Sequence, residues 1–318
     1  MAGACFATPA VVMMTALAAV YFGMAGVGVP PGLLEGIQAA AVVVIAFALW
    51  RLRSAVVRPL AASVAVAALA FTLWLPAWSA AWVLAGGGVT LAAWVWRGRR
   101  VRSPRKRSKG EGGAGAVAGL VALMVGGLAV AGGAVAAGAL GRVGTAAIPA
   151  LAWVFLRTGA LLFGGGYVLL PLLEPPALAH GWLTKGEFLD GIALGQATPG
   201  PIVTASAFVG YAAAGVPGAL VATAAIYLPA FIVVLAGTGP FLRAFQGRPA
   251  VRAAADGFNA AAFGSIAAAT LSLARVGLAS PLRMAVAAVA ALALVRRVPV
   301  WAVLLGALAV GAVAAAVH

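Results

Sequence analysis

The sequence is poor in charged residues, and it has almost no cysteine or histidine. Among 318 residues there are six acids, one cysteine and two histidines, and charged side chains make up only 8%. A soluble domain carries roughly 25% charged residues, so this composition excludes an ordinary soluble protein. The single cysteine, Cys5, excludes a disulfide framework. Because His180 and His318 have no cysteine or acidic cluster beside them, we expect no metal site and no cofactor.

What the chain has instead is apolar sequence with basic residues around it. Hydrophobic residues make up 64%, the mean hydropathy is +1.10, and 21 Lys and Arg give a net charge of +15. In a soluble protein this charge would suggest nucleic acid. Here most basic residues flank apolar stretches, as topology signals that face anionic lipid do. The composition therefore predicts an all-α polytopic membrane protein in a lipid bilayer, with no nucleic-acid partner.

Stretches of about 20 apolar residues predict ten to eleven transmembrane segments. The first apolar run lacks the basic start of a signal peptide and is counted as a span. One segment, 187–214, is interrupted by prolines and glycine. The segments are placed at 6–27, 34–50, 60–78, 80–96, 114–140, 148–172, 187–214, 217–241, 255–274, 281–295 and 298–317. We expect such a chain in the inner (plasma) membrane of the cell.

A basic linker at 97–113 divides the chain. It holds eight Lys or Arg among Gly, Ser and Pro. Binding to nucleic acid or to lipid head groups is one interpretation, but a cytoplasmic loop that orients the protein is the stronger one. The sequence thus predicts an incomplete first transporter half at 1–96, the linker, and a complete second half at 114–318.

The two halves share a short sequence. Residues 36–41 read GIQAAA and residues 257–262 read GFNAAA, at a shift of 221. The arginines of 51–58 follow this segment in the first copy, whereas those of 243–252 precede it in the second. If both basic clusters are cytoplasmic, the copies are inverted relative to each other, as in many transporters.

Inversion requires an odd number of crossings between the copies. Spans 114–140 and 148–172 with one broken crossing at 187–214 would supply three. The second copy also has residues 150–226 ahead of the shared part, and the first copy has no counterpart. Either the first half is shortened, or the chain begins downstream of its true start.

Thr198-Pro199-Gly200-Pro201 breaks the apolar segment 187–214. Pro201 can occupy the first turn of a new helix, so the N–H groups of Val203 and Thr204 would point into the break. A helix N-terminus binds anions, and we expect Gln196, Thr198 and Thr204 to add donors. The alternative is a plain proline kink.

Arg157 and the triplet Gly164-Gly165-Gly166 lie within the span 148–172. A charge inside a span costs at least about 2.5–3.5 kcal/mol, and a guanidinium suits a tetrahedral oxyanion. The alternative for Arg157 is a side chain that reaches the membrane surface. The glycines predict either close helix packing or an irregular backbone that approaches a ligand.

Two acids begin the broken segment. Thr184 and Glu187 fit a capping box at a helix N-terminus. Asp190 lies deeper and is predicted to be a proton site or an ion-pair partner of Arg157, and Glu187 is a second candidate for a proton or ion-pair site. Ser206 has no nearby His or Lys to activate it, so we expect no enzyme.

Three motifs resemble those of the chromate ion transporter family. Phe-Gly-Gly-Gly stands at 163–166, Gly-Trp-Leu at 181–183 and Gln-Ala-Thr-Pro-Gly-Pro at 196–201. The resemblance covers about 155–235, and Arg157 stands where the family usually has a basic residue. It implies a transporter that exports chromate, driven by proton exchange or membrane potential, and confers chromate resistance. Sulfate, a dianion of similar shape, is an alternative substrate.

Long members of that family have two homologous halves, each with the Gly-rich and the Pro-Gly-Pro elements. Here the first half has neither a Phe-Gly-Gly-Gly nor a Pro-Gly-Pro stretch. The resemblance therefore also allows a homodimer, a partner half-transporter, or a shortened chain that does not transport alone.

Overall fold

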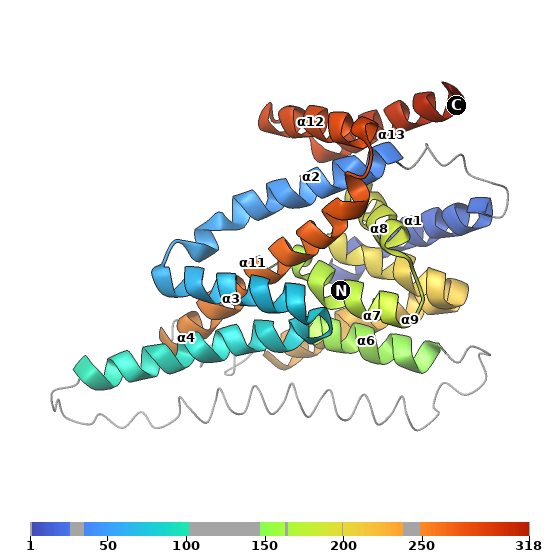
Figure 1. The fold of residues 1–318 in the computed structure, drawn as a ribbon. Coiled ribbons are helices and arrows are strands. Elements are labelled where there is room, and N and C mark those ends of the chain that lie inside the picture. The colour runs from blue at the N-terminus through green and yellow to red at the C-terminus, as the bar shows by residue number, and fades with distance from the viewer. Residues whose placement is uncertain are drawn as a thin grey trace.

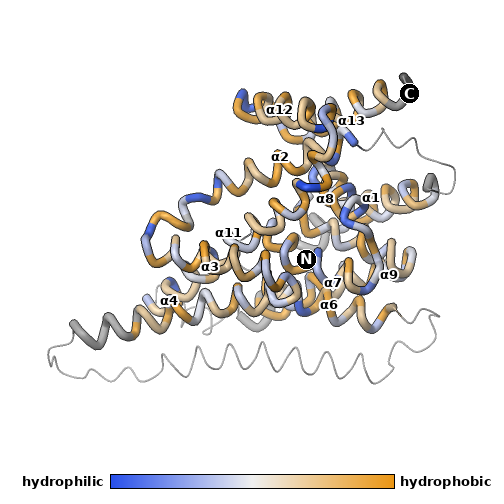
Figure 2. The backbone as a smooth tube through the Cα atoms, viewed as in Figure 1, coloured by the Kyte–Doolittle hydropathy of each residue, from blue (hydrophilic) through white to orange (hydrophobic). Residues whose placement is uncertain are grey.

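The computed structural model describes residues 2–25, 35–101, 147–162, 165–198, 200–237 and 249–317. Within these ranges the regular structure is α-helix and short 3-10 helix, without strands (Figure 1). Most of each helix is apolar, and hydrophilic residues gather at ends and connections, as between α2 and α3 (Figure 2). The predicted all-α class is confirmed.

The first half contains four α-helices in its described part. Pro59 stands in the first turn of α3, where its missing N–H costs nothing. The predicted span 60–78 ends early, at Trp74, because Leu75 precedes Pro76 and leaves the helical conformation. The elements are α1 (Ala2–Ala25), α2 (Glu35–Arg51), η1 (Leu52–Val56), α3 (Pro59–Trp74), η2 (Pro76–Trp78) and α4 (Ser79–Val101).

The second half follows a stretch outside the described residues, which includes the predicted span 114–140. Of the predicted linker only 97–101 is described, and it continues α4. The elements are α6 (Ile148–Ala160), η3 (Gly166–Val168), α7 (Leu169–Ala179), α8 (Lys185–Ala197), η4 (Ile202–Thr204), α9 (Ala205–Gly237), α11 (Pro249–Gly277), α12 (Pro281–Val295) and α13 (Val300–Val317).

The predicted span 148–172 is interrupted in the structure. Helix α6 ends at Ala160, and the next described helical element, η3, begins at Gly166. Gly165 has φ of 124°, a conformation that side chains other than glycine rarely adopt. Gly165 and Gly166 therefore lie in irregular backbone, as one of the two interpretations predicted.

The prediction of one broken crossing at 187–214 is wrong, because the chain reverses there. Gly195 of α8 lies against Ala205, and Gly191 lies against the ring of Phe208, so α8 and the start of α9 run antiparallel. We call α8, the connection and residues 205–213 the helical hairpin. Glycine at both contacts lets the two helices approach closely.

Helix α9 bends after the hairpin. Ala214 and Gly215 leave the helical conformation, and Gly210 lies against the backbone of Gly218. Residues 216–237 therefore form a separate arm that folds back along the hairpin. This bend lies where the sequence predicts a boundary between two segments.

The described helices have membrane character. Three helical segments, 35–54, 202–233 and 249–277, are long and apolar enough to cross a membrane, and the second includes the bend of α9. Trp50 and Trp74 at helix ends are 56% and 79% exposed. Tryptophan at such positions is typical of the membrane–water interface.

The repeated segments exchange partners between the halves. Helix α2 packs on α12 and α13, and α11 packs on α3 and α4 (Figure 1). Gly36 lies against the backbone of Ala307, and Gly257 lies against that of Gly86. Both pairs are related by the same shift of 221, so the sequence repeat is also a repeat of contacts.

Helices α2 and α11 are antiparallel. Arg58, after α2, pairs with Asp256 near the start of α11 at 3.0 Å. At the other end, Gly277 lies against Gln38 and Val42 of α2. The equivalent helices of the two halves thus run in opposite directions, while their inversion in a membrane stays a prediction.

Candidate functional site

Two interruptions of helices meet inside the second half. The first lies between α6 and α7, and the second lies at the tip of the helical hairpin. A side chain at Gly166 would overlap the side chain of Ile202 and touch Val203, so η3 and η4 are in direct contact. Two predicted site residues, Gly164 and Pro199, lie outside the described residues. The predicted breaks are therefore a single structural region.

The backbone at the hairpin tip differs from the prediction. Pro201 is extended, with φ of −71° and ψ of 139°, and a 3-10 turn follows it in place of an α-helix. In this turn the N–H of Thr204 donates to the Pro201 carbonyl at 2.9 Å. The expectation that this N–H is free to bind an anion is wrong, because the tighter 3-10 turn satisfies it three residues back.

The two predicted threonine donors are also in use. The Thr204 hydroxyl donates to the Pro201 carbonyl at 3.0 Å, and the Thr198 hydroxyl donates to the Gly195 carbonyl at 2.9 Å. Both side chains are buried. Their hydroxyls hold the backbone on either side of the tip, so the structure gives them a structural role.

Gln196 and Ser206 hold the free polar groups near the tip. Both amide atoms of Gln196 and the hydroxyl of Ser206 are buried without a hydrogen-bond partner among the described residues. These residues follow the contacting pair Gly195 and Ala205 on the two sides of the hairpin. Since buried polar groups in native proteins are almost always paired, such groups point to a ligand.

Sequence reasoning considered Ser206 only as a nucleophile and missed it as a donor. The signal that would have found it is the reversal of the chain, which brings Ala205, the residue before Ser206, against Gly195, the residue before Gln196. That reversal depends on the packing of Gly191 and Gly195, which no motif encodes.

Arg157 lies on α6, less than two turns before the first interruption. Its side chain is partly buried and forms no ion pair with a carboxylate in the described part of the chain. Helix α6 is held against the second arm of α9, where Gly159 meets the backbone of Ile226. The predicted ion pair with Asp190 is not formed, which leaves the guanidinium available to an anion.

Helix α1 of the first half covers the hairpin along its length. Ala10 lies against Gly200 at the tip. Further along, the Tyr21 hydroxyl donates to Asp190 Oδ2 at 2.8 Å, and the Phe22 ring lies 5.1 Å from that of Phe208. The first half therefore covers the region in which the two interruptions of the second half meet.

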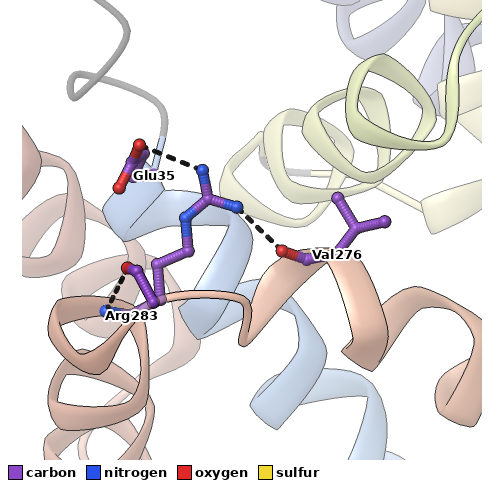
Figure 3. A network of polar contacts seen from close by, with 4 residues as sticks. Glu35, Val276 and Arg283 are labelled. Atoms are coloured by element: carbon purple, nitrogen blue, oxygen red, sulfur yellow. Dashed lines mark hydrogen bonds and ion pairs between the residues drawn. The ribbon is translucent and has the colours of Figure 1, made fainter.

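The base of the hairpin is fixed by polar contacts. The predicted capping box is confirmed: the N–H of Thr184 donates to Glu187 Oε2 at 2.7 Å, and the Thr184 hydroxyl accepts from the Glu187 N–H. Nearby, Arg283 pairs with Glu35 at 3.1 Å and donates to the Val276 carbonyl at 2.8 Å (Figure 3). Together, these two contacts of Arg283 join the ends of α2, α11 and α12.

The family model described as Chromate transporter matches residues 149–312, which is more than half of the chain. The chain belongs to this family. The match includes both interruptions, the hairpin and the helices from α11 to most of α13.

Curated relatives agree with the family. A chromate transport protein of Cupriavidus metallidurans is 29% identical over 279 residues, which are 86% of this chain and 64% of the relative. A chromate transport protein of Pseudomonas aeruginosa is 40% identical over 38% of this chain and 29% of its own length. A probable chromate transport protein of Synechococcus elongatus is 33% identical over 42% of this chain and 34% of its own length.

These alignments cover less than two thirds of each relative. No solved structure matches the chain.

Proposed function

We propose that this chain transports chromate, a tetrahedral oxyanion, out of the cell across the inner (plasma) membrane and so confers chromate resistance. The proposal is supported by membership of the chromate transporter family. The observation that carries it is the contact between Gly166 and Ile202, which joins the two interruptions into one region with unpaired donors.

In this proposal the anion binds beside the hairpin tip. The first N–H groups of a helix have no partner within the helix, and those of Ile202 and Val203 begin η4 next to the tip. Gln196 and Ser206 supply neutral donors. Arg157 supplies a permanent positive charge that matches a tetrahedral oxyanion. Gly165 keeps the backbone open to the ligand, because nothing lies within 4 Å of a Cβ at that residue.

Membrane potential favours export. Moving a dianion out of a negatively charged interior releases about 4.6 kcal/mol per 100 mV, since each charge contributes about 2.3 kcal/mol. Outward movement therefore needs no separate energy source.

The test is the replacement of Arg157. Arg157→Ala should abolish chromate resistance and chromate transport in vesicles while leaving membrane insertion intact, because the anion loses its charged partner. Arg157→Lys should retain part of the activity, since it keeps the charge but not the bidentate geometry. Arg53→Ala is the matched control, because Arg53 is exposed and stacks on Trp50 at the end of α2. Full transport by a correctly inserted Arg157→Ala protein would refute the role of Arg157.

Sulfate is the main alternative substrate, because it shares the charge and shape of chromate. Transport of labelled chromate in the presence of excess sulfate distinguishes the two. Chromate transport that sulfate leaves unchanged indicates a chromate-specific site, and strong inhibition indicates a general site for divalent oxyanions.

A second candidate function is that of a partner-dependent half-transporter. The Gln-x-Thr-Pro-Gly-Pro motif occurs once in the chain, and the chain spans 64% of the C. metallidurans relative. The partner would be a second copy or another half-transporter. Expression in a host without family members tests this: resistance from the chain alone, with a monomer after mild cross-linking, would exclude it.

A further inference from the structure

The deepest ionisable group of the hairpin is the carboxyl group of Asp190. Its side chain is 2% exposed. Oδ2 accepts from the Tyr21 hydroxyl at 2.8 Å, whereas Oδ1 is buried without a hydrogen-bond partner among the described residues. An oxygen left unpaired in a buried carboxylate is costly, and a proton on that oxygen removes the charge and the cost.

The groups around Asp190 come from both halves. Tyr21 on α1 and Gln38 on α2 are neutral polar groups that favour the ionised carboxylate, and Arg283 on α12 does so at longer range. Glu187, one turn away on α8, disfavours the ionised form. None of them forms an ion pair with Asp190 in the described part of the chain, because Arg283 pairs with Glu35 (Figure 3). The carboxylate thus has no positive partner to hold it in the charged form.

The remaining charged groups at the base of the hairpin are engaged with each other. Lys185 Nζ donates to the Ser272 hydroxyl at 2.9 Å, and that hydroxyl donates to Glu174 Oε1 at 2.9 Å. This chain of hydrogen bonds links α8, α11 and α7. Asp190 is therefore separate from it.

We propose that Asp190 is a proton site whose occupancy controls anion binding at the hairpin tip; this inference rests on the proposed function. The proton binds Oδ1, and Oδ2 keeps the hydrogen bond from Tyr21. With Asp190 ionised, the site holds a negative charge near the incoming dianion. With Asp190 protonated, that repulsion is gone, so binding of the anion and binding of the proton favour each other.

Asp190 lies close enough to the hairpin tip for its charge to change the affinity for the anion strongly. Asp190 and Thr198 are eight residues apart along α8, or roughly 12 Å at the helical rise. At an effective dielectric constant of about 20, a carboxylate and a dianion at that distance change each other's binding on the order of 100-fold. Water in the site would reduce the effect toward about tenfold. By linkage, the bound anion strengthens proton binding by the same factor.

The direction of the pH dependence of chromate affinity follows from this coupling. Protonation is favoured at low pH, so the affinity for chromate is highest there and falls as Asp190 ionises. Asp190→Asn is neutral at every pH, so this variant keeps the high affinity. Chromate itself gains a proton in mild acid, but that change is common to all variants and cancels in their comparison.

The experiment measures chromate affinity of the purified full chain against pH. The wild-type affinity should fall at least about tenfold more than that of Asp190→Asn as the pH rises. In weak buffer, chromate binding should take up a proton from solution with the wild type and not with Asp190→Asn. Asp256→Asn makes the same change at an exposed carboxylate that pairs with Arg58, and it should behave as the wild type.

Tyr21→Phe supplies a second, conservative variant. The Tyr21 hydroxyl stabilises the ionised carboxylate, so its removal should let chromate binding persist to higher pH than in the wild type. If the chromate affinities of the wild type and Asp190→Asn depend on pH equally, the inference is overturned but the proposed function is not. If Asp190→Asn does not fold, an unshifted pH dependence of chromate affinity in Tyr21→Phe has the same consequence. No chromate binding by the folded wild type overturns the proposed function as well.

Discussion

At the scale of single residues, the polar side chains around the hairpin tip fall into two groups. Thr198 and Thr204 donate to backbone carbonyls beside the tip. The amide atoms of Gln196 and the hydroxyl of Ser206 are buried with no hydrogen-bond partner among the described residues. The first group stabilises the irregular backbone, and the second is available to a ligand.

This division can be tested with one substitution from each group. Gln196→Leu should weaken chromate binding about tenfold or more, because a buried donor to a charged ligand is worth about 1.5–3 kcal/mol, and it should not lower the melting temperature. Thr204→Val should lower the melting temperature, by an amount that corresponds to about 1 kcal/mol, with little change in affinity. Calorimetry and thermal unfolding in detergent measure the two effects. Unchanged affinity in Gln196→Leu would exclude Gln196 from the site.

Some residue roles can be predicted from sequence and others cannot. The capping box of Thr184 and Glu187 is local, with partners three residues apart, so the sequence predicts it correctly. The hydrogen bonds of Thr204 cannot be predicted in this way, because a 3-10 turn and an α-helix start with the same residues. Ser206 acquires its role only after the chain folds back on α8.

At the scale of elements, the proposed site depends on the contact between η3 and η4. Gly166 leaves space that the side chain of Ile202 fills. A larger residue at 166 must displace Ile202 and with it the hairpin tip.

Gly166→Val should therefore abolish transport and destabilise the protein by about 1–3 kcal/mol, the usual cost of overpacking. Adding Ile202→Ala should restore part of both properties, because it removes the methyl group that the new valine side chain would meet. Gly88→Val is the matched control, since nothing lies within 4 Å of a Cβ at that residue. Transport assays and melting temperatures decide the outcome, and failure of the double variant to recover either property would argue against the contact.

The sequence predicted where the helices stop but not where the chain goes next. Proline and glycine at 199–201 end α8 whatever surrounds them. Whether the following helix continues or reverses is decided by packing, here by Gly191 against Phe208 and Gly195 against Ala205. Both outcomes are compatible with the same apolar residues.

At the scale of the whole molecule, the two halves are arranged around α2 and α11, which run in opposite directions. The connection after α2 and the connection after α11 are equivalent in the repeat, and they lie at opposite ends of this helix pair. An inverted repeat would place them on opposite sides of a membrane.

Single cysteines in these connections test the inversion. In a Cys5→Ser background, Ser54→Cys and Ala279→Cys each place a thiol at an exposed residue. A thiol reagent that does not cross membranes should label Ala279→Cys in intact cells and Ser54→Cys only after lysis, because arginines surround Ser54 and favour the cytoplasm. Labelling of both from the same side would rule out inverted halves.

The repeat itself could be predicted from six residues, because Gly36 and Gly257 stand in matching sequence. The packing of α2 and α11 on helices of the opposite half could not be predicted in this way. Each glycine permits close approach of another helix, but the sequence does not say that Gly36 meets α13 and Gly257 meets α4.

The exchange of partners has a consequence for synthesis. Helix α2 leaves the ribosome early, yet the helices that cover it, α12 and α13, are the last ones described in the chain. The small-residue face of α2 therefore stays uncovered by α12 and α13 until translation is nearly finished. We therefore expect the nascent protein to assemble late and all at once, with membrane chaperones needed to shield α2 in the interval.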